Sequence, residues 1–339
     1  MIWGMRVFKT FFVYIAYWMA LRAIPALGDE TCSISPSIIT IPNIADADIG
    51  ELNLQDGSIQ DWFDVVDNPR LFASQLSPDP VGDGAAYDPQ DFDFMVFLSW
   101  NRQIGRLYVG VVIVDDILVE VQDTDDLEVS DHTVILAVDG DRDGGEYLVD
   151  RQCCQTEEEY QSLHSRTAQR YVAHYQGRAG RRVQRIGPAR EWLNAAEWTF
   201  GWGTVGESTF GWGNVSSVVE FYITPFDCLH RDSARESLKS ELFWKKLISF
   251  DLAVVDRDDP SSDSRSVYSL SGAIDRRDSR LFVDALLYGS RHAVQCHGPE
   301  CKGIEPICVV PHSCVGESGV GATAVETATW GMVKVVQDK

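Results

Sequence analysis

The sequence predicts an all-β protein, an antiparallel jelly-roll-like β-sandwich, and two observations favour this fold class. Apolar runs of strand length, such as residues 107–114 and 132–138, are rich in β-branched residues and end abruptly in acidic residues and glycine. Strand patterns also dominate the chain, and they do not alternate with long amphipathic helices as in a parallel βαβ sheet. We therefore expect a β core with carboxylates at the ends of its strands.

The first 28 residues have the pattern of a secretory signal peptide. Arg6 and Lys9 provide a positive start, residues 10–20 are apolar, and Ala26-Leu27-Gly28 offers small residues for cleavage. An uncleaved membrane anchor is the alternative, although the apolar run is shorter than the roughly 20 residues of a membrane-spanning helix. We expect a secreted, periplasmic or cell-surface protein with no membrane insertion after cleavage.

The charge of the chain restricts its partners. Cleavage after Gly28 removes Arg6, Lys9 and Arg22 from the 29 basic residues, so 26 basic and 51 acidic residues remain, with a net charge of −25. This charge argues against binding to nucleic acid or to anionic membranes. It is compatible with calcium and with neutral partners such as glycans.

The first half of the chain has an extended lead-in over residues 29–47, and the predicted domain covers residues 48–288. A turn at Asp56-Gly57-Ser58 opens this domain, and residues 68–90 are rich in proline, glycine and aspartate, as in loops. Residues 91–100 form a strand. The short turn 101–106 joins this strand to 107–114, so the two are predicted to form a hairpin.

The second half begins with residues 157–175, which are compatible with a helix. Together with the arginine-rich residues 177–190 they are interpreted as part of an exposed helical and basic insertion, 152–190. If this insertion has a function, the prediction is that it docks to an acidic glycan. Strands follow at 218–223 and 248–255, with a short helix between them at 232–243. Residues 268–272 and 280–287 are predicted to be the closing strands.

Eight cysteines lie after the predicted signal peptide, and an even number in an exported chain favours disulfides. Four of them form a cysteine-rich segment, 289–316, which a tail, 317–339, follows. Cys153 and Cys154 are adjacent, and we expect each to bond elsewhere. A zinc site that includes His292, His297 and His312 is the rival interpretation, but the cysteine spacing lacks paired C-x2-C motifs.

Two groups of aspartates are candidate calcium sites. Asp139, Asp141 and Asp143 alternate before Gly144, and such a loop supplies the several oxygen ligands that calcium prefers. This is not a complete EF-hand, because no helix pair is evident and residue 150 is aspartate rather than glutamate. Asp256 and Asp258, followed by Asp259, form the second group. A solvated acidic turn is the alternative for both.

Tryptophans in a glycine-rich repeat are the candidate sugar-stacking residues. The segment Thr199-Phe200-Gly201-Trp202-Gly203 recurs at residues 209–213, and flat aromatic faces with a few polar groups are typical of small-ligand sites. Trp202 and Trp212 are the predicted stacking residues, with Trp198 and Trp192 behind them. Glu220, Asn214 and Arg190 are the candidates for hydrogen bonds to the sugar. Packing of these indoles in the core is the alternative. Trp62 and Trp100 are predicted to be core residues.

The order of these motifs resembles the family 9 carbohydrate-binding modules and related DOMON-like sandwiches. The matching pieces are Asp56-Gly57 with Asp61-Trp62, Leu107-Tyr108-Val109 before Asp115-Asp116, residues 134–139 with Gly144-Gly145-Glu146-Tyr147, Glu220-Phe221 with Ile223 and Pro225, and Phe250 with Asp256, Asp258 and Asp259. The resemblance covers residues 48–288. Ile135, where the family often has an acid, and the insertion 152–190 depart from it. The resemblance implies a jelly-roll-like sandwich, sugar binding and structural calcium.

We therefore interpret the chain as an exported, non-catalytic carbohydrate-binding protein that serves in polysaccharide catabolism. A glycoside hydrolase or its accessory subunit is an alternative, although no nucleophile, zinc-protease or phosphate-binding motif is present. A haem-binding module, with Met95 or Met332 as a thioether ligand, is another alternative, since related sandwiches carry haem. An adhesive module without a small ligand is the last.

Overall fold

The computed structural model describes twelve parts of the chain, which are residues 38–66, 68–117, 132–149, 151–174, 180–181, 183–186, 191–207, 215–230, 232–259, 264–272, 274 and 277–289. The predicted signal peptide and the tail lie outside these residues, as does all of the cysteine-rich segment except Gly289. Within the described ranges, no helix has both the length and the apolar character that a membrane crossing requires.

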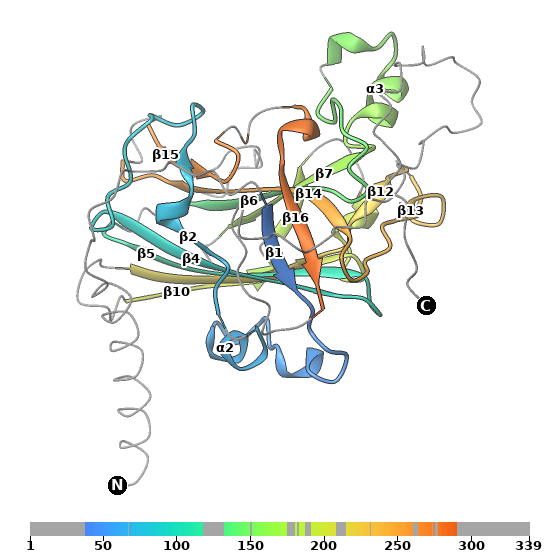
Figure 1. Cartoon of the computed structure of the whole chain (residues 1–339). Coiled ribbons are helices and arrows are strands. Elements are labelled where there is room, and N and C mark those ends of the chain that lie inside the picture. The colour runs from blue at the N-terminus through green and yellow to red at the C-terminus, as the bar shows by residue number, and fades with distance from the viewer. Residues whose placement is uncertain are drawn as a thin grey trace, which may run out of the picture.

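The described residues form a sandwich of an eight-stranded and a six-stranded sheet, which confirms the predicted fold class (Figure 1). The eight-stranded sheet has the order β1 (Ile38–Pro42), β16 (Val283–Tyr288), β14 (Leu247–Asp256), β6 (Thr133–Asp139), β7 (Ala168–His174) and β9 (Val183–Ile186), and β15 (Ser266–Ser269) pairs with β14 and with β3 (Ser77–Pro78). The six-stranded sheet has the order β2 (Leu71–Phe72), β4 (Phe92–Asn101), β5 (Arg106–Asp115), β11 (Val215–Ile223), β10 (Thr199–Glu207) and β8 (Gly180–Arg181). Strands in both sheets pair antiparallel, except that β1 runs parallel to β16.

Short elements complete the structure. A two-stranded ribbon consists of β12 (Phe226–Cys228) and β13 (Leu238–Lys239), and the α-helices among the described residues are α2 (Gln60–Val66) and α3 (Glu157–Leu163). The 3₁₀ helices are η1 (Ile49–Glu51), η2 (Ala73–Gln75), η3 (Arg151–Cys153), η4 (Glu191–Asn194) and η5 (Ser279–Leu281). Because β1 pairs with β16, the sandwich begins before residue 48, within the predicted lead-in.

Both faces of the central strands are covered, which explains why their sequences are apolar runs rather than alternating patterns. In β5, Val109 and Val111 belong to the core between the two sheets, whereas Tyr108 and Val112 belong to a second apolar cluster on the outer face. Helix α2 covers this outer face, and Figure 1 shows it below the layer of β4, β5 and β10. A strand that is buried on both faces gains from apolar residues at every position.

Trp62 of α2 is the centre of the outer cluster. Its side chain is wholly buried, and its indole N–H donates a hydrogen bond to Glu220 Oε1 at 2.8 Å. Gly110 of β5 provides the space, because a Cβ there would lie 2.7 Å from an indole carbon of Trp62. The predicted core positions of Trp62 and Trp100 are confirmed, since they are 0% and 2% exposed.

A buried carboxyl lies on the outer face of the eight-stranded sheet. Asp251 of β14 accepts hydrogen bonds from the backbone N–H groups of Leu252 and Ser271, and from the Ser271 hydroxyl. Burial raises the pKa of Asp251 to about 7 despite these donors, and the nearby Asp79 adds to the rise. Its ionisation therefore opposes folding.

We expect an Asp251→Asn variant to change how stability depends on pH. A raised carboxyl pKa contributes stability that is fully present below the unfolded pKa of about 3.8 and is lost as pH rises towards 7. From pH 5 to pH 7 the variant should therefore gain about 2 kcal/mol in free energy of unfolding relative to the wild type. Urea denaturation at several pH values measures this difference. A constant difference over that range would contradict the raised pKa.

Two helix predictions are wrong. The helix expected over residues 157–175 ends with α3 at Leu163, and residues 168–174 form β7 in the middle of a sheet. Tyr171 packs between the sheets and Val172 on the outer face, so a strand buried on both sides gave no alternating signal. The insertion 152–190 is therefore not wholly exposed.

The second wrong helix is the one expected over residues 232–243. This segment contains a turn and then β13. Leu238 within it and Trp244 directly after it point to solvent, with 43% and 53% of their surface exposed. No buried apolar stripe at helical spacing is available to hold a helix against the sandwich.

The cysteine prediction also needs correction. Cys153 and Cys154 form a disulfide with each other, at the turn that η3 makes before α3, and Cys228 is also disulfide-bonded.

Candidate functional site

The register of the strands places two acidic centres at opposite ends of the sandwich. In the pairing of β14 with β6, Ser249 lies opposite Asp139 and Val255 lies opposite Thr133. At about 3.4 Å per residue, the two ends are separated by roughly 20 Å. We call them the Asp139 centre and the His132 centre.

Asp139 organises the loop of the first centre. It is wholly buried at the end of β6, and its Oδ1 accepts a hydrogen bond from the backbone N–H of Arg142 at 2.8 Å. Its Oδ2 accepts hydrogen bonds from the N–H of Gly144 at 3.1 Å and from the hydroxyl of Ser279 at 2.8 Å. Arg142 and Gly144 have positive φ angles of 59° and 69°, which tighten the loop around this carboxylate.

Asp141 and Asp143 complete the predicted trio. One carboxylate oxygen from each of Asp139, Asp141 and Asp143 lies within 4.8 Å of the others. Burial, and then the charges of Asp139 and Asp141, raise the pKa of Asp143 to about 8. Its Oδ1 is inaccessible to solvent and has no hydrogen-bond partner among the described residues. A cation between the three carboxylates would satisfy this atom.

Asp227 and Lys246 border the Asp139 centre. Lys246 is 1% exposed, lies 3.9 Å from Asp227 Oδ1 through its Nζ, and donates a hydrogen bond to Ser240 Oγ at 2.7 Å. A Cβ on Gly140 would approach Ser240 Oγ to 2.5 Å and Asp227 Oδ1 to 2.7 Å, so glycine permits this close packing. The ammonium group offsets only part of the negative charge of the centre.

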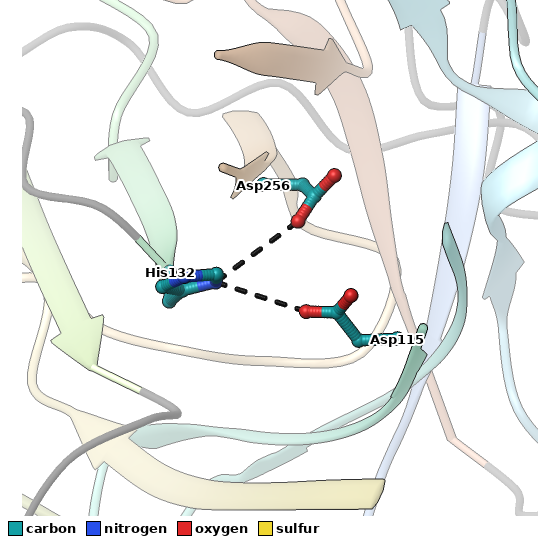
Figure 2. A group of neighbouring side chains, drawn as sticks. All are labelled: Asp115, His132 and Asp256. Carbon is teal, nitrogen blue, oxygen red and sulfur yellow. Dashed lines mark ion pairs between the residues drawn. The ribbon is translucent and has the colours of Figure 1, made fainter. Parts of the chain in front are cut away.

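The His132 centre lies where β5 and β14 end and β6 begins. His132, Asp115 and Asp256 are buried, and Figure 2 shows the two carboxylates directed towards the imidazole. His132 Nδ1 lies 3.8 Å from Asp115 Oδ2 and 4.0 Å from Asp256 Oδ1. Burial raises the pKa of Asp115 to about 7, and burial together with the charge of Asp115 raises that of Asp256 to about 9.

Three more carboxylates adjoin the His132 centre. Potential ligand atoms lie within 4.8 Å of one another in Asp91 with Asp256 and Asp258, and in Asp115 with Asp116 and Asp258. Burial and the neighbouring acids raise the pKa of Asp258 to about 6. The predicted pair Asp256 and Asp258 thus belongs to this larger centre.

A solvent-open aromatic pocket is the third feature. Its volume is about 490 Å³, and it is lined by Asn43, Trp100, Arg102, Trp244, Tyr288 and Gly289. Trp244 is half exposed, and the Lys245 ammonium lies 4.8 Å from the centre of its ring. The pocket lies at the end of the sandwich where β1, β4 and β16 end. Residues from both sheets therefore line it.

Hydrogen bonds fix the floor of this pocket. The Trp100 indole donates to the backbone carbonyl of Tyr288 at 3.0 Å, and the Asn43 amide donates to the carbonyl of Trp100 at 3.1 Å. The exposed rim residues Trp244 and Arg102 therefore surround a rigid base. An aromatic face beside a guanidinium and an amide is a typical arrangement for a polar ligand with an apolar side.

Of the residues predicted to bind sugar, the structure describes Trp202, Trp198, Trp192 and Glu220. Trp202 is half buried on the outer face of β10, where its backbone pairs with that of Glu220. Glu220 is 1% exposed, its Oε1 accepts the hydrogen bond from the Trp62 indole, and burial raises the pKa of its carboxyl to about 8. Trp198 packs on the core beside Trp192, with ring centres 5.7 Å apart. Trp212, Asn214 and Arg190 lie outside the described residues.

Sequence reasoning missed the aromatic pocket and the part of His132 in an acidic centre. Trp244 directly follows the predicted helix 232–243, and no motif connects it to Tyr288. His132 begins an apolar run directly after an acidic stretch, and Asp115 ends the previous run. These two positions were the available signal, because the end of β5 and the start of β6 lie at the same end of the sandwich, one in each sheet.

Comparison with known proteins gave matches to solved structures alone. No family model and no curated protein matches the chain. One similar structure is a family 9 carbohydrate-binding module from Caldicellulosiruptor kristjanssonii in complex with cellotriose, at 15% identity and a TM-score of 0.45, covering 77% of this chain and 100% of that one. Another is a family 9 module from the same organism in complex with glucose, at 13% identity and a TM-score of 0.43, covering 76% and 98%.

Both structures belong to the family that the sequence motifs resemble. Identity and TM-score at this level do not indicate what this chain binds. Its proposed function therefore depends on its own residues.

Proposed function

We propose that this protein binds carbohydrate without cleaving it, and that the pocket beside Trp244 holds the sugar. The observation that carries the proposal is a half-exposed indole at the rim of a pocket with a rigid floor. A pyranose has an apolar face of C–H groups and an equatorial rim of hydroxyls. The indole of Trp244 suits the first, and the side chains of Asn43 and Arg102 suit the second.

Trp202 and Trp212 remain a second candidate surface. Trp202 is half buried on the outer face of β10, and it is not among the residues that line the pocket beside Trp244. The proposal also includes export and a part in polysaccharide catabolism. The predicted signal peptide supports export, and an acidic sandwich with an aromatic pocket suits recognition of neutral glycans outside the cell.

The proposal includes a structural calcium ion at Asp139, Asp141 and Asp143. The fit rests on the unsatisfied Asp143 oxygen and on an oxygen-only set of side chains, which hard cations prefer. This ion would also support the pocket. Lys246 lies two residues after Trp244 and is held at the Asp139 centre through Ser240, so the loop that carries the indole is anchored there.

Replacing Trp244 with alanine is expected to weaken glycan binding at least tenfold, because loss of a large aromatic contact residue commonly costs about 1.4 kcal/mol or more. Affinity gels and calorimetry with a panel of neutral polysaccharides and cello-oligosaccharides measure the effect. Trp202→Ala tests the second surface, and Leu238→Ala is a control for loss of an exposed apolar side chain.

Loss of binding in Trp202→Ala with full binding in Trp244→Ala would move the site to β10. If the folded wild-type chain binds no glycan of the panel, the carbohydrate proposal is wrong, and an adhesive module becomes the better interpretation.

A further inference from the structure

The two acidic centres differ in the chemistry of their side chains. The Asp139 centre brings together carboxylate oxygens, whereas the His132 centre adds an imidazole nitrogen to them. Oxygen ligands suit calcium and magnesium, while imidazole suits zinc and other divalent transition metals. The difference therefore bears on which ion each end of the sandwich selects.

Direct pairing explains the geometry of the His132 centre poorly. The separations of 3.8 Å and 4.0 Å are longer than hydrogen bonds, which rarely exceed about 3.2 Å. Both carboxylates also face the same nitrogen, Nδ1, which has at most one proton to donate. Bonds of about 2.0–2.2 Å to a central ion would separate neighbouring ligand atoms by about 3.0–3.6 Å. A small inward movement of the three groups gives this spacing.

Asp256 supplies an independent observation. Its side chain is 1% exposed, and its Oδ1, the atom that faces His132 Nδ1, has no hydrogen-bond partner in the described part of the chain. A buried carboxylate oxygen without a donor costs free energy, because it loses its hydration without replacement. A cation at the point where Asp256, Asp115 and His132 converge would remove this cost (Figure 2).

We propose that His132, Asp115 and Asp256 bind one divalent transition-metal ion of the zinc class, with Asp258 as the further oxygen ligand. Asp258 belongs to a ligand set with each of the two aspartates. The ion takes the place of the calcium that the sequence predicts for Asp256 and Asp258. It links the end of β5 in one sheet to the ends of β6 and β14 in the other. This inference does not depend on carbohydrate binding.

The test is metal binding by the purified chain after removal of bound ions with a chelator. Zn²⁺ and Co²⁺ are titrated by calorimetry, and visible absorption follows Co²⁺. We expect one Zn²⁺ per chain, bound at least tenfold more tightly than by His132→Gln or Asp256→Asn. His230→Gln, which changes a half-exposed histidine outside both acidic centres, is the matched control and should bind Zn²⁺ as the wild type does.

The proposal is overturned if the folded, metal-free wild type binds neither Zn²⁺ nor Co²⁺, a result that requires no variant. It is also overturned if His132→Gln and Asp256→Asn both bind Zn²⁺ as the wild type does, or if Ca²⁺ displaces Zn²⁺ from the site at equal concentration. The wild-type titration decides the case if His132→Gln does not fold.

Discussion

Replacing Asp139 with alanine is expected to lower the free energy of unfolding by about 3–5 kcal/mol, since three buried or partly buried donors lose their acceptor. The donors are the N–H groups of Arg142 and Gly144 and the hydroxyl of Ser279. Urea denaturation in calcium-free buffer measures the loss. Asp284→Asn is the matched control, because it removes only the partly exposed ion pair with Arg142 and should cost less than about 1 kcal/mol.

Calcium should raise the stability of the wild type but not that of the Asp139 variant. A ligand at one hundred times its dissociation constant stabilises the folded state by about 2.7 kcal/mol. The Asp143→Asn variant distinguishes the stability that calcium contributes from the stability that the loop hydrogen bonds contribute. In that variant the hydrogen bonds that Asp139 accepts stay in place. Without calcium we expect it to be at least as stable as the wild type, because its amide removes a carboxyl whose raised pKa makes ionisation oppose folding, and we expect no gain with calcium. An equal gain in both proteins would place the calcium elsewhere.

Replacing Gly110 with valine is expected to lower the free energy of unfolding by about 3 kcal/mol or more, an effect similar to that of Asp139→Ala. The reason is that the indole of Trp62 has no room to move aside. A Cβ at position 110 would lie 2.7 Å and 3.0 Å from two of its ring carbons. The displaced ring would lose both its burial and its hydrogen bond to Glu220. Denaturant unfolding monitored by circular dichroism measures the cost.

Two further sets of variants test whether the contact between position 110 and Trp62 causes the loss of stability. Gly50→Ala should change stability by less than about 0.5 kcal/mol, since a Cβ there meets nothing within 4 Å. A Gly110→Ala substitution should cost less in a Trp62→Phe background than in the wild type, because the smaller ring relieves the contact. Additive costs in this double-mutant cycle would show that the contact with Trp62 is not the cause.

The predicted strands 91–100, 107–114, 132–138, 218–223 and 248–255 are confirmed as β4, β5, β6, β11 and β14. Three of them have an aspartate directly at their end, which are 107–114, 132–138 and 248–255. Strand β7 was missed because alanine, arginine and glutamine interrupt its apolar residues. Its burial comes from neighbours on both faces that are distant in the sequence.

The candidate sites also differ in whether their residues are close together or far apart in the sequence. The trio Asp139, Asp141 and Asp143 is local, so its spacing alone predicted that the carboxylates converge, as they do. Trp244 and Tyr288 meet in the pocket because one precedes β14 and the other ends β16, and β14 and β16 pair antiparallel. No local pattern contains that information.

The sequence by itself determined the all-β class, the order of the central strands along the chain and the acidic loop after β6, because each depends on residues close together in the chain. Only the tertiary structure decided that His132 meets Asp115 and Asp256, that Gly110 admits Trp62, and that Glu220 is buried against Trp62. These contacts depend on strand register and on the packing of the layers. Register is set by the whole sheet, since a shift of one residue turns every side chain to the opposite face.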